Sequence, residues 1–120
     1  MSLAGKILLI ALKATAARTT QWGKTTDTDP TKAASRTATI ATHITKGAIR
    51  VLLDTDQIRE EIFLATFEGA LANVLGNSKI LDQFNPDNPE NAQEIGEAAS
   101  RYARAAAQII AEQLSQAKPS

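Results

Sequence analysis

Apolar residues recur every three or four positions along most of the chain, and no segment alternates between apolar and polar residues as a half-buried strand does. This spacing is the period of the α-helix. It predicts long helices over residues 2–21, 30–53, 55–75 and 89–117, with one short helical turn over residues 78–84. We therefore predict an all-α fold, an antiparallel helical bundle of about four helices, as a single domain spanning residues 1–120.

Capping residues mark the ends of the predicted helices. Polar side chains of the type that accept hydrogen bonds from the first turn stand at Ser2, Asp29, Asp54 and Asn88. A proline at the first helical position follows Asp29 and Asn88, and Gln57 completes a variant of the capping box with Asp54. Gly76 is placed to end the third helix.

Two of the predicted helices carry more apolar surface than one packed side needs. Residues 7–12 of the first helix are apolar all round, and the third helix has two apolar stripes on nearly opposite faces. One stripe comprises Phe63, Phe67, Ala70, Leu71 and Val74. The other comprises Ile58, Ile62, Ala65, Gly69 and Ala72. We expect a homo-oligomer or larger assembly whose buried contact area comes from Ile58, Ile62, Phe63, Phe67 and Leu71.

The last helix is predicted to turn one apolar side inward. The inward positions are Ile95, Ala99, Tyr102, Ala106, Ile109 and Ile110. A small-molecule pocket inside the bundle would be lined by Phe63, Phe67, Tyr102 and Ile109, but no polar groups converge there to orient a ligand. We therefore interpret these residues as core.

The net charge of zero conceals a division between the two halves of the chain. Residues 1–53 carry eight basic and two acidic side chains, a balance of +6, whereas residues 54–120 carry five basic and eleven acidic ones, a balance of −6. Such asymmetry is informative about partners. Complementary patches on one subunit favour pairing within the fold or a contact between copies.

Five basic side chains of the second helix lie within one sector of its surface: Lys32, Arg36, His43, Lys46 and Arg50. The simplest interpretation is the solvated face of an amphipathic helix. Two functional interpretations remain open, contact with an acidic protein surface or binding of nucleic acid or another anion. The zero net charge and the pI near 6.6 disfavour nucleic acid, because nucleic-acid-binding domains typically exceed a pI of about 9.

No catalytic or cofactor-binding pattern is present. The segment Gly23–Thr26 reads GKTT, but the first glycine of a phosphate-binding loop is missing and a helix precedes the segment where a strand is required. His43 is the single histidine and the chain has no cysteine, so we predict no metal site, no cofactor and no enzyme activity.

The sequence has no run of about 20 apolar residues that would cross a membrane, and the run 7–12 is shorter than the core of a secretory signal. We expect a protein of the cytoplasm or of an assembled particle. The predicted function is that of a non-enzymatic interaction or structural subunit that self-associates through apolar helix faces and complementary charge, as in a virion, filament or multi-protein complex. The alternative is a nucleic-acid or anion-binding protein that uses the basic face of residues 32–50.

Overall fold

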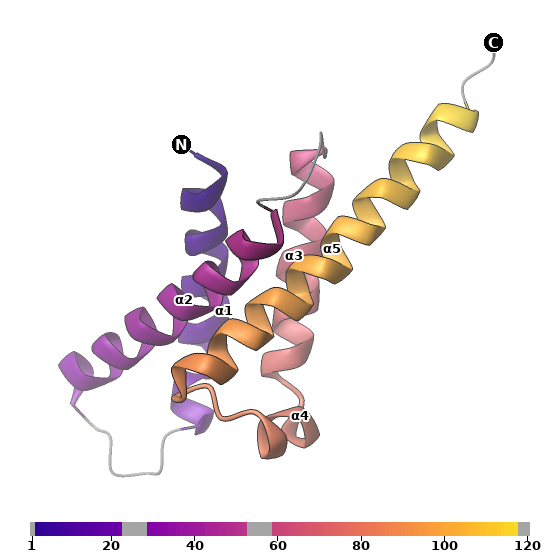
Figure 1. Cartoon of the computed structure of the whole chain (residues 1–120). Helices are drawn as coiled ribbons and strands as arrows, with labels where there is room; N and C mark the ends of the chain where they lie inside the picture. Colours follow the sequence, from indigo (N-terminus) through magenta and orange to yellow (C-terminus); the bar gives the residue numbers. More distant parts are fainter. Residues whose placement is uncertain (1, 23–28, 53–58, 118–120) are drawn as a thin grey trace.

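The computed structural model describes residues 2–22, 29–52 and 59–117. Within these ranges the fold is all-helical, as predicted (Figure 1). The helices are α1 (Leu3–Trp22), α2 (Pro30–Leu52), α3 (Glu60–Leu75), α4 (Ser78–Gln83) and α5 (Pro89–Ala117). These four long helices and one short helix correspond to the four helices and short turn that the hydrophobic spacing predicts.

Local hydrogen bonds at the helix ends confirm most of the predicted caps. The side chains of Ser2, Asp29 and Asn88 accept backbone N–H bonds from the first turn of their helices at 3.1, 3.0 and 2.9 Å. Gly76 caps α3 at its C-terminus, where its N–H donates to Ala72. These contacts satisfy some of the backbone groups that every helix end leaves unpaired.

The start of α3 differs from the prediction. The helix begins at Glu60 rather than at Thr55, because Arg59 is extended (φ −77°, ψ 106°) and provides no side-chain cap. Asp54 and Gln57, the predicted capping pair, lie outside the described residues. Glu60 and Glu61 occupy the first turn of α3, where negative charge favours the positive end of the helix dipole.

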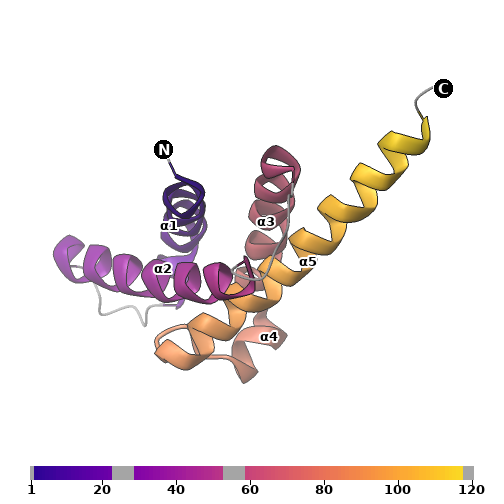
Figure 2. The ribbon, with the colours of Figure 1, turned by 45° about the horizontal axis from the view of Figure 1, so that its top comes forward.

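α5 packs against both α2 and α3, and α1 packs against the same two helices. Consecutive long helices reverse direction, so the pair with the most extensive contact, α2 with α5, runs in parallel (Figure 2). Ion pairs Lys6–Glu60 (2.9 Å) and Lys13–Glu68 (3.2 Å) hold α1 alongside α3 in the same parallel sense. The predicted antiparallel arrangement therefore describes consecutive long helices, but not the α2–α5 and α1–α3 pairs, which run in parallel.

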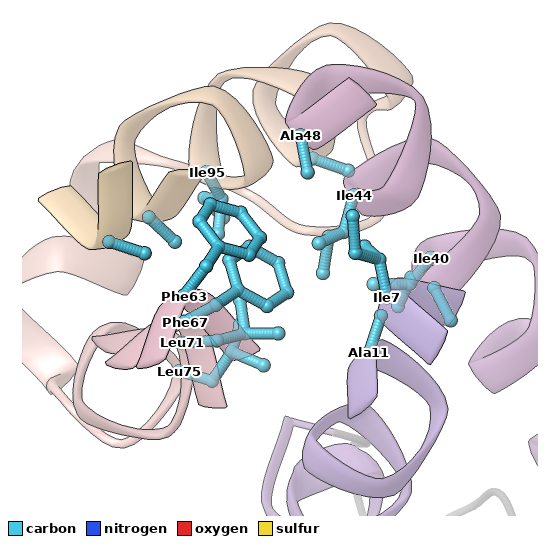
Figure 3. Packing of buried hydrophobic residues seen from close by; sticks show 14 of the residues in the cluster. Ile7, Ala11, Ile40, Ile44, Ala48, Phe63, Phe67, Leu71, Leu75 and Ile95 are labelled. Carbon is cyan, nitrogen blue, oxygen red and sulfur yellow. The ribbon is translucent and has the colours of Figure 1, made fainter. Parts of the chain in front are cut away.

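The core lies where α1, α2, α3 and α5 meet (Figure 3). Its largest fully buried side chains are Phe63, Phe67, Ile7, Ile40, Ile44, Leu71 and Leu75. The two phenylalanine rings stack with centroids 5.8 Å apart and planes 12° from parallel. Full burial of each such side chain contributes about 1.5–3 kcal/mol relative to exposure. The rest of the core is mostly alanine, which allows the helices to approach closely.

The closest approach is between α2 and α5. A methyl group added at Gly47 would overlap the backbone carbonyl of Gln93, and one added at Gly96 would overlap the backbone carbonyl of Ile44. The buried hydroxyl of Ser100 donates a hydrogen bond to the carbonyl oxygen of Ala48 at 3.0 Å. The two backbones are thus in direct contact, which only glycine at these positions permits.

α5 is longer than the body against which it packs, and its C-terminal part projects beyond the other helices (Figures 1 and 2). The molecule measures 61 × 30 × 21 Å. Its radius of gyration is 15.6 Å, whereas a compact chain of this length has about 13.6 Å. The projecting end of α5 therefore has water, rather than protein, on most of its sides.

Candidate protein interaction surface

The C-terminal half of α5, from Tyr102 onward, exposes large apolar side chains. The exposed fractions are 65% for Tyr102, 53% for Ile109, 36% for Ile110 and 45% for Leu114. The apolar spacing predicts Tyr102, Ile109 and Ile110 to face inward, and this prediction is wrong. For Ile109 and Ile110 the physical reason is the length of α5, because Ala107 is the last buried position among residues 89–115 and the helix continues to Ala117. Tyr102 lies in the packed part of α5 but lines a groove between α3 and α5 instead of entering the core.

α3 turns one of its two predicted apolar stripes inward and the other outward. Phe63, Phe67 and Leu71 are completely buried within the chain. They belong to the monomer core and do not supply the partner-facing area that we expected of them. On the outward stripe Ile62 is half-buried, whereas Ala65, Gly69 and Ala72 are exposed, and Ile58 lies outside the described residues.

A groove of about 540 Å³ lies between the exposed sides of α3 and α5. Its walls are Thr66, Gly69, Ala70, Asn73 and Val74 from α3 and Ala98, Ala99 and Tyr102 from α5. None of these side chains is charged, and most are small. An uncharged groove with a small-residue floor accepts apolar side chains from another helix without leaving a buried charge unpaired. Tyr102 is both a wall of this groove and one of the exposed apolar side chains of α5.

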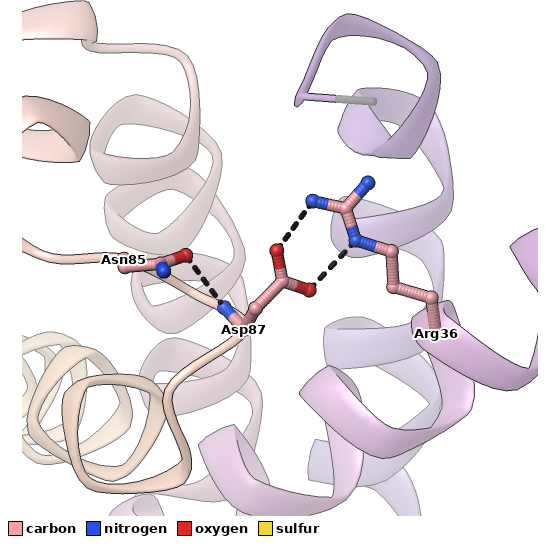
Figure 4. Close-up of polar contacts among 3 residues, drawn as sticks. All are labelled: Arg36, Asn85 and Asp87. Atoms are coloured by element: carbon pink, nitrogen blue, oxygen red, sulfur yellow. Dashed lines mark hydrogen bonds and ion pairs between the residues drawn. The ribbon is translucent and has the colours of Figure 1, made fainter. Parts of the chain in front are cut away.

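Part of the basic face of α2 is neutralised within the chain. Arg36 forms a two-pronged ion pair with Asp87, with N–O distances of 2.7 and 2.6 Å (Figure 4). Asp87 is held in place because its N–H donates to the side chain of Asn85 at 3.0 Å. The Arg36 side chain is 19% exposed, so this guanidinium is committed to the loop before α5. Sequence reasoning missed Asp87, since its partner is 51 residues away.

Arg50 belongs to a different cluster at the other end of α2. It lies 3.6 Å from Glu97, and Arg101 lies 3.7 Å from the same carboxylate. Both distances exceed the hydrogen-bond range of about 2.7–3.2 Å. Together with Arg104 and Val51, these side chains surround a hollow of about 370 Å³. Two guanidinium groups therefore pair with one carboxylate and a third lies at the same hollow, an excess of positive charge that the tertiary structure creates from two separate helices.

The remaining members of the predicted basic face lie apart from these pairs. Lys32 and Lys46 are exposed, and His43 is half-buried. The Nδ1 atom of His43 is buried without a hydrogen-bond partner in the described structure. Two of the five predicted residues, Arg36 and Arg50, thus pair with different carboxylates, whereas Lys32 and Lys46 remain exposed.

Threonine hydroxyls on the same helix are also committed. Those of Thr39, Thr42 and Thr45 donate to backbone carbonyls four residues earlier, at 2.9, 2.7 and 2.7 Å. They therefore bond to the backbone of their own helix, as threonine side chains in helices commonly do. They do not form a set of free hydroxyls for a phosphate.

The described residues do not bring three potential metal ligands of the His, Asp or Glu type together. The GKTT segment, Gly23–Thr26, falls outside the described residues. No helix in the described ranges is both long enough and apolar enough to span a bilayer.

Comparison of the chain with models of known protein families, with curated proteins and with solved structures gives no match.

Proposed function

We propose that this protein is a non-enzymatic interaction or structural subunit that self-associates, in the cytoplasm or within an assembled particle. The observation that carries the proposal is the exposed apolar surface of α5, Tyr102, Ile109, Ile110 and Leu114, beside the uncharged α3–α5 groove. Large apolar side chains grouped in this way on a small protein are typical of a protein-binding surface.

The total surface of the chain supports the same proposal. It exposes 7568 Å², whereas a compact monomer of 12.8 kDa exposes about 6,300 Å². The excess of roughly 1,300 Å² is larger than the roughly 800 Å² per partner that a standard protein–protein interface removes from water. A contact over the groove and the free end of α5 would remove a large part of this excess.

Charge substitution within α5 tests this function. Ile109→Glu places a carboxylate in the exposed apolar surface, and Gln108→Glu places the same charge on the adjacent, solvent-facing side of the helix. We expect sedimentation velocity of the wild-type chain over a range of concentrations to show assembly. Ile109→Glu should weaken that assembly by roughly tenfold or more, because burying an unpaired carboxylate is costly. Gln108→Glu should leave it unchanged. A wild-type chain that stays monomeric throughout would refute the proposal.

One observation favours a second function, the binding of a phosphate-bearing ligand. Arg50, Arg101 and Arg104 surround the hollow at Glu97 with a surplus of positive charge and with N–H groups suited to phosphate oxygens. This position differs from the basic face of residues 32–50 that the sequence indicates. A gel-shift series with single-stranded and duplex nucleic acid tests it. Binding that weakens with salt and is lost in Arg50→Glu with Arg104→Glu, but not in Lys32→Glu, would support this alternative.

A further inference from the structure

The hollow between the end of α2 and the middle of α5 carries more positive than negative charge. Its walls are Arg50 and Val51 from α2 and Glu97, Arg101 and Arg104 from α5. Among these residues, three guanidinium groups and one carboxylate give a balance of +2. The volume of about 370 Å³ lies within the range of about 300–1,000 Å³ that is usual for small-molecule sites.

Glu97 provides the one carboxylate among the described residues of the hollow, and two arginines share it. Its Oε1 lies 3.6 Å from Nη1 of Arg50, and its Oε2 lies 3.7 Å from Nη2 of Arg101. These are ion pairs, but both distances exceed the range of a hydrogen bond. The two arginine side chains are more than two-thirds exposed, at 69% and 68%. Each guanidinium therefore keeps N–H donors that Glu97 does not use.

Arg104 is the third guanidinium of the hollow and has no carboxylate of its own. It is half-buried, and within the described part of the chain it forms neither an ion pair nor a hydrogen bond. A charge that is partly withdrawn from water is costly unless it is paired. Arg50 lies in the last turn of α2, where positive charge favours the negative end of the helix dipole. Arg104 lies far from both ends of α5, so the dipole does not account for it.

Acidic side chains border the hollow on both sides along α5. With about 100° of rotation per residue, Glu94, Arg101 and Glu112 lie within a sector of about 20°. At about 1.5 Å per residue, Glu94 lies about 10 Å from Arg101 in one direction and Glu112 about 16 Å in the other. Both acidic side chains are exposed. A long polyanion laid along α5 would pass over them, whereas a compact anion in the hollow would avoid them.

From these observations we infer that the hollow binds a small molecule carrying a phosphate monoester, and that Glu97 competes with this phosphate for Arg50 and Arg101. The inference rests on the second proposed function, the binding of a phosphate-bearing ligand, and specifies its ligand and its internal competitor. A phosphate monoester carries a charge of about −1.5 to −2 at pH 7, which matches the balance of the hollow. Guanidinium groups donate paired N–H bonds to phosphate oxygens. The bound phosphate would link α2, through Arg50, to α5, through Arg104.

Thermal unfolding tests the site, because a ligand that binds only the folded chain stabilises it. With glycerol phosphate at about ten times its Kd, the Tm of the wild type should rise by about 3–6 °C over chloride of equal ionic strength. Arg104→Gln should lose most of this rise. Lys32→Gln, which removes the same charge at the other end of α2, should keep it. Because phosphate also strengthens burial non-specifically, the comparison between variants is decisive. An equal rise in Arg104→Gln and the wild type would overturn the inference.

Glu97→Gln tests the competition and predicts a gain rather than a loss. The substitution removes the charge of the carboxylate but keeps the shape of the side chain. It should tighten the binding of glycerol phosphate by roughly tenfold in isothermal titration calorimetry, since it removes a repulsive charge and releases two arginines. Loss of folding cannot produce such a gain. Weaker binding by Glu97→Gln would show that Glu97 holds the arginines in place, and would overturn its role as a competitor.

A single-stranded oligonucleotide without a terminal phosphate separates the inference from the function on which it rests. We expect it to bind little in the same titration, because Glu94 and Glu112 border the hollow. If the oligonucleotide binds through Arg104 and glycerol phosphate does not bind, the inferred ligand is wrong but a phosphate-bearing ligand remains. If neither binds, the inference and the second proposed function are both overturned, and self-association through the apolar surface is unaffected.

Discussion

The two parts of α5 have the same apolar spacing but opposite surroundings. In residues 89–107, every third or fourth side chain is buried against α2 and α3, and Gly96 brings the α2 backbone into contact. In residues 108–115, all side chains are exposed except the half-buried Ala111. The comparison shows that the spacing of apolar residues specifies which side of a helix favours burial. It does not specify whether the same chain or a partner buries that side.

The two parts are also stabilised differently. Most helical stability in proteins comes from packing, and an isolated helix shorter than about 12–15 residues is marginal in water. The projecting segment has no packing of its own, so its helical form depends on propagation from the packed part. An apolar partner on Ile109, Ile110 and Leu114 would add the missing contacts. We regard this difference as the physical basis of the proposed function.

The largest expected contrast comes from shortening the same residue type in both parts. Ile95 is 3% exposed, whereas Ile109 is 53% exposed. Ile95→Ala should lower the free energy of unfolding by about 2–5 kcal/mol, because it removes buried atoms and leaves a cavity. Ile109→Ala should change it by less than about 0.5 kcal/mol. Urea denaturation at low protein concentration, where the chain is monomeric, provides the measurement. Equal losses would mean that the end of α5 is packed after all.

Alanine substitution of two glycines gives the next largest contrast, and the two expected changes in stability have opposite signs. Gly96→Ala forces a methyl group into the Ile44 carbonyl and should destabilise the chain by about 1–3 kcal/mol or more. An added methyl at Gly69, in the middle of α3, meets nothing within 4 Å. Gly69→Ala should therefore stabilise the chain by about 0.5–1 kcal/mol, since alanine favours the helix. Thermal unfolding monitored by circular dichroism will show both shifts. If Gly96→Ala left the thermal stability unchanged, the close approach of α2 and α5 would be contradicted.

The smallest contrast concerns two serines of α5. The buried hydroxyl of Ser100 bonds to the carbonyl of Ala48 at 3.0 Å, and Ser115 is exposed. Ser100→Ala should lower the free energy of unfolding by about 1 kcal/mol through the lost hydrogen bond. Ser115→Ala should be neutral or slightly stabilising, since alanine is the better helix former. Chemical denaturation of both variants decides the matter. Similar effects would show that the Ser100 bond adds no stability.

Sequence reasoning located the helices well because their signals are local. The caps at Ser2, Asp29 and Asn88 act on the next turn, and the stop at Gly76 acts on the previous one. Periodicity also identified Ile95 and Ala99 as core. The boundary at Glu60 was missed, since Arg59 carries no capping signal that marks the start of a helix there.

The candidate surface was less predictable. The sequence shows two apolar stripes on the third helix but does not indicate which of them is buried within the chain. In the structure the stripe with the larger side chains, Phe63, Phe67 and Leu71, is buried. The division of the basic face was equally hidden: Arg36 pairs with a loop residue, while Arg50 joins arginines of α5. The contacts of Arg36 and of Arg50 both join residues about 50 positions apart in the sequence.

The sequence by itself therefore determined where this chain is helical, where most of its helices begin and end, and which side of each helix is apolar. These properties follow from interactions within a few residues, through backbone hydrogen bonds and the 3.6-residue period. Only the tertiary structure decided which apolar stripe of α3 became core. It also decided that α2 and α5 approach closely at Gly47 and Gly96, and that α5 extends beyond the other helices. Those choices depend on how the lengths and shapes of separate helices fit, which no local signal encodes.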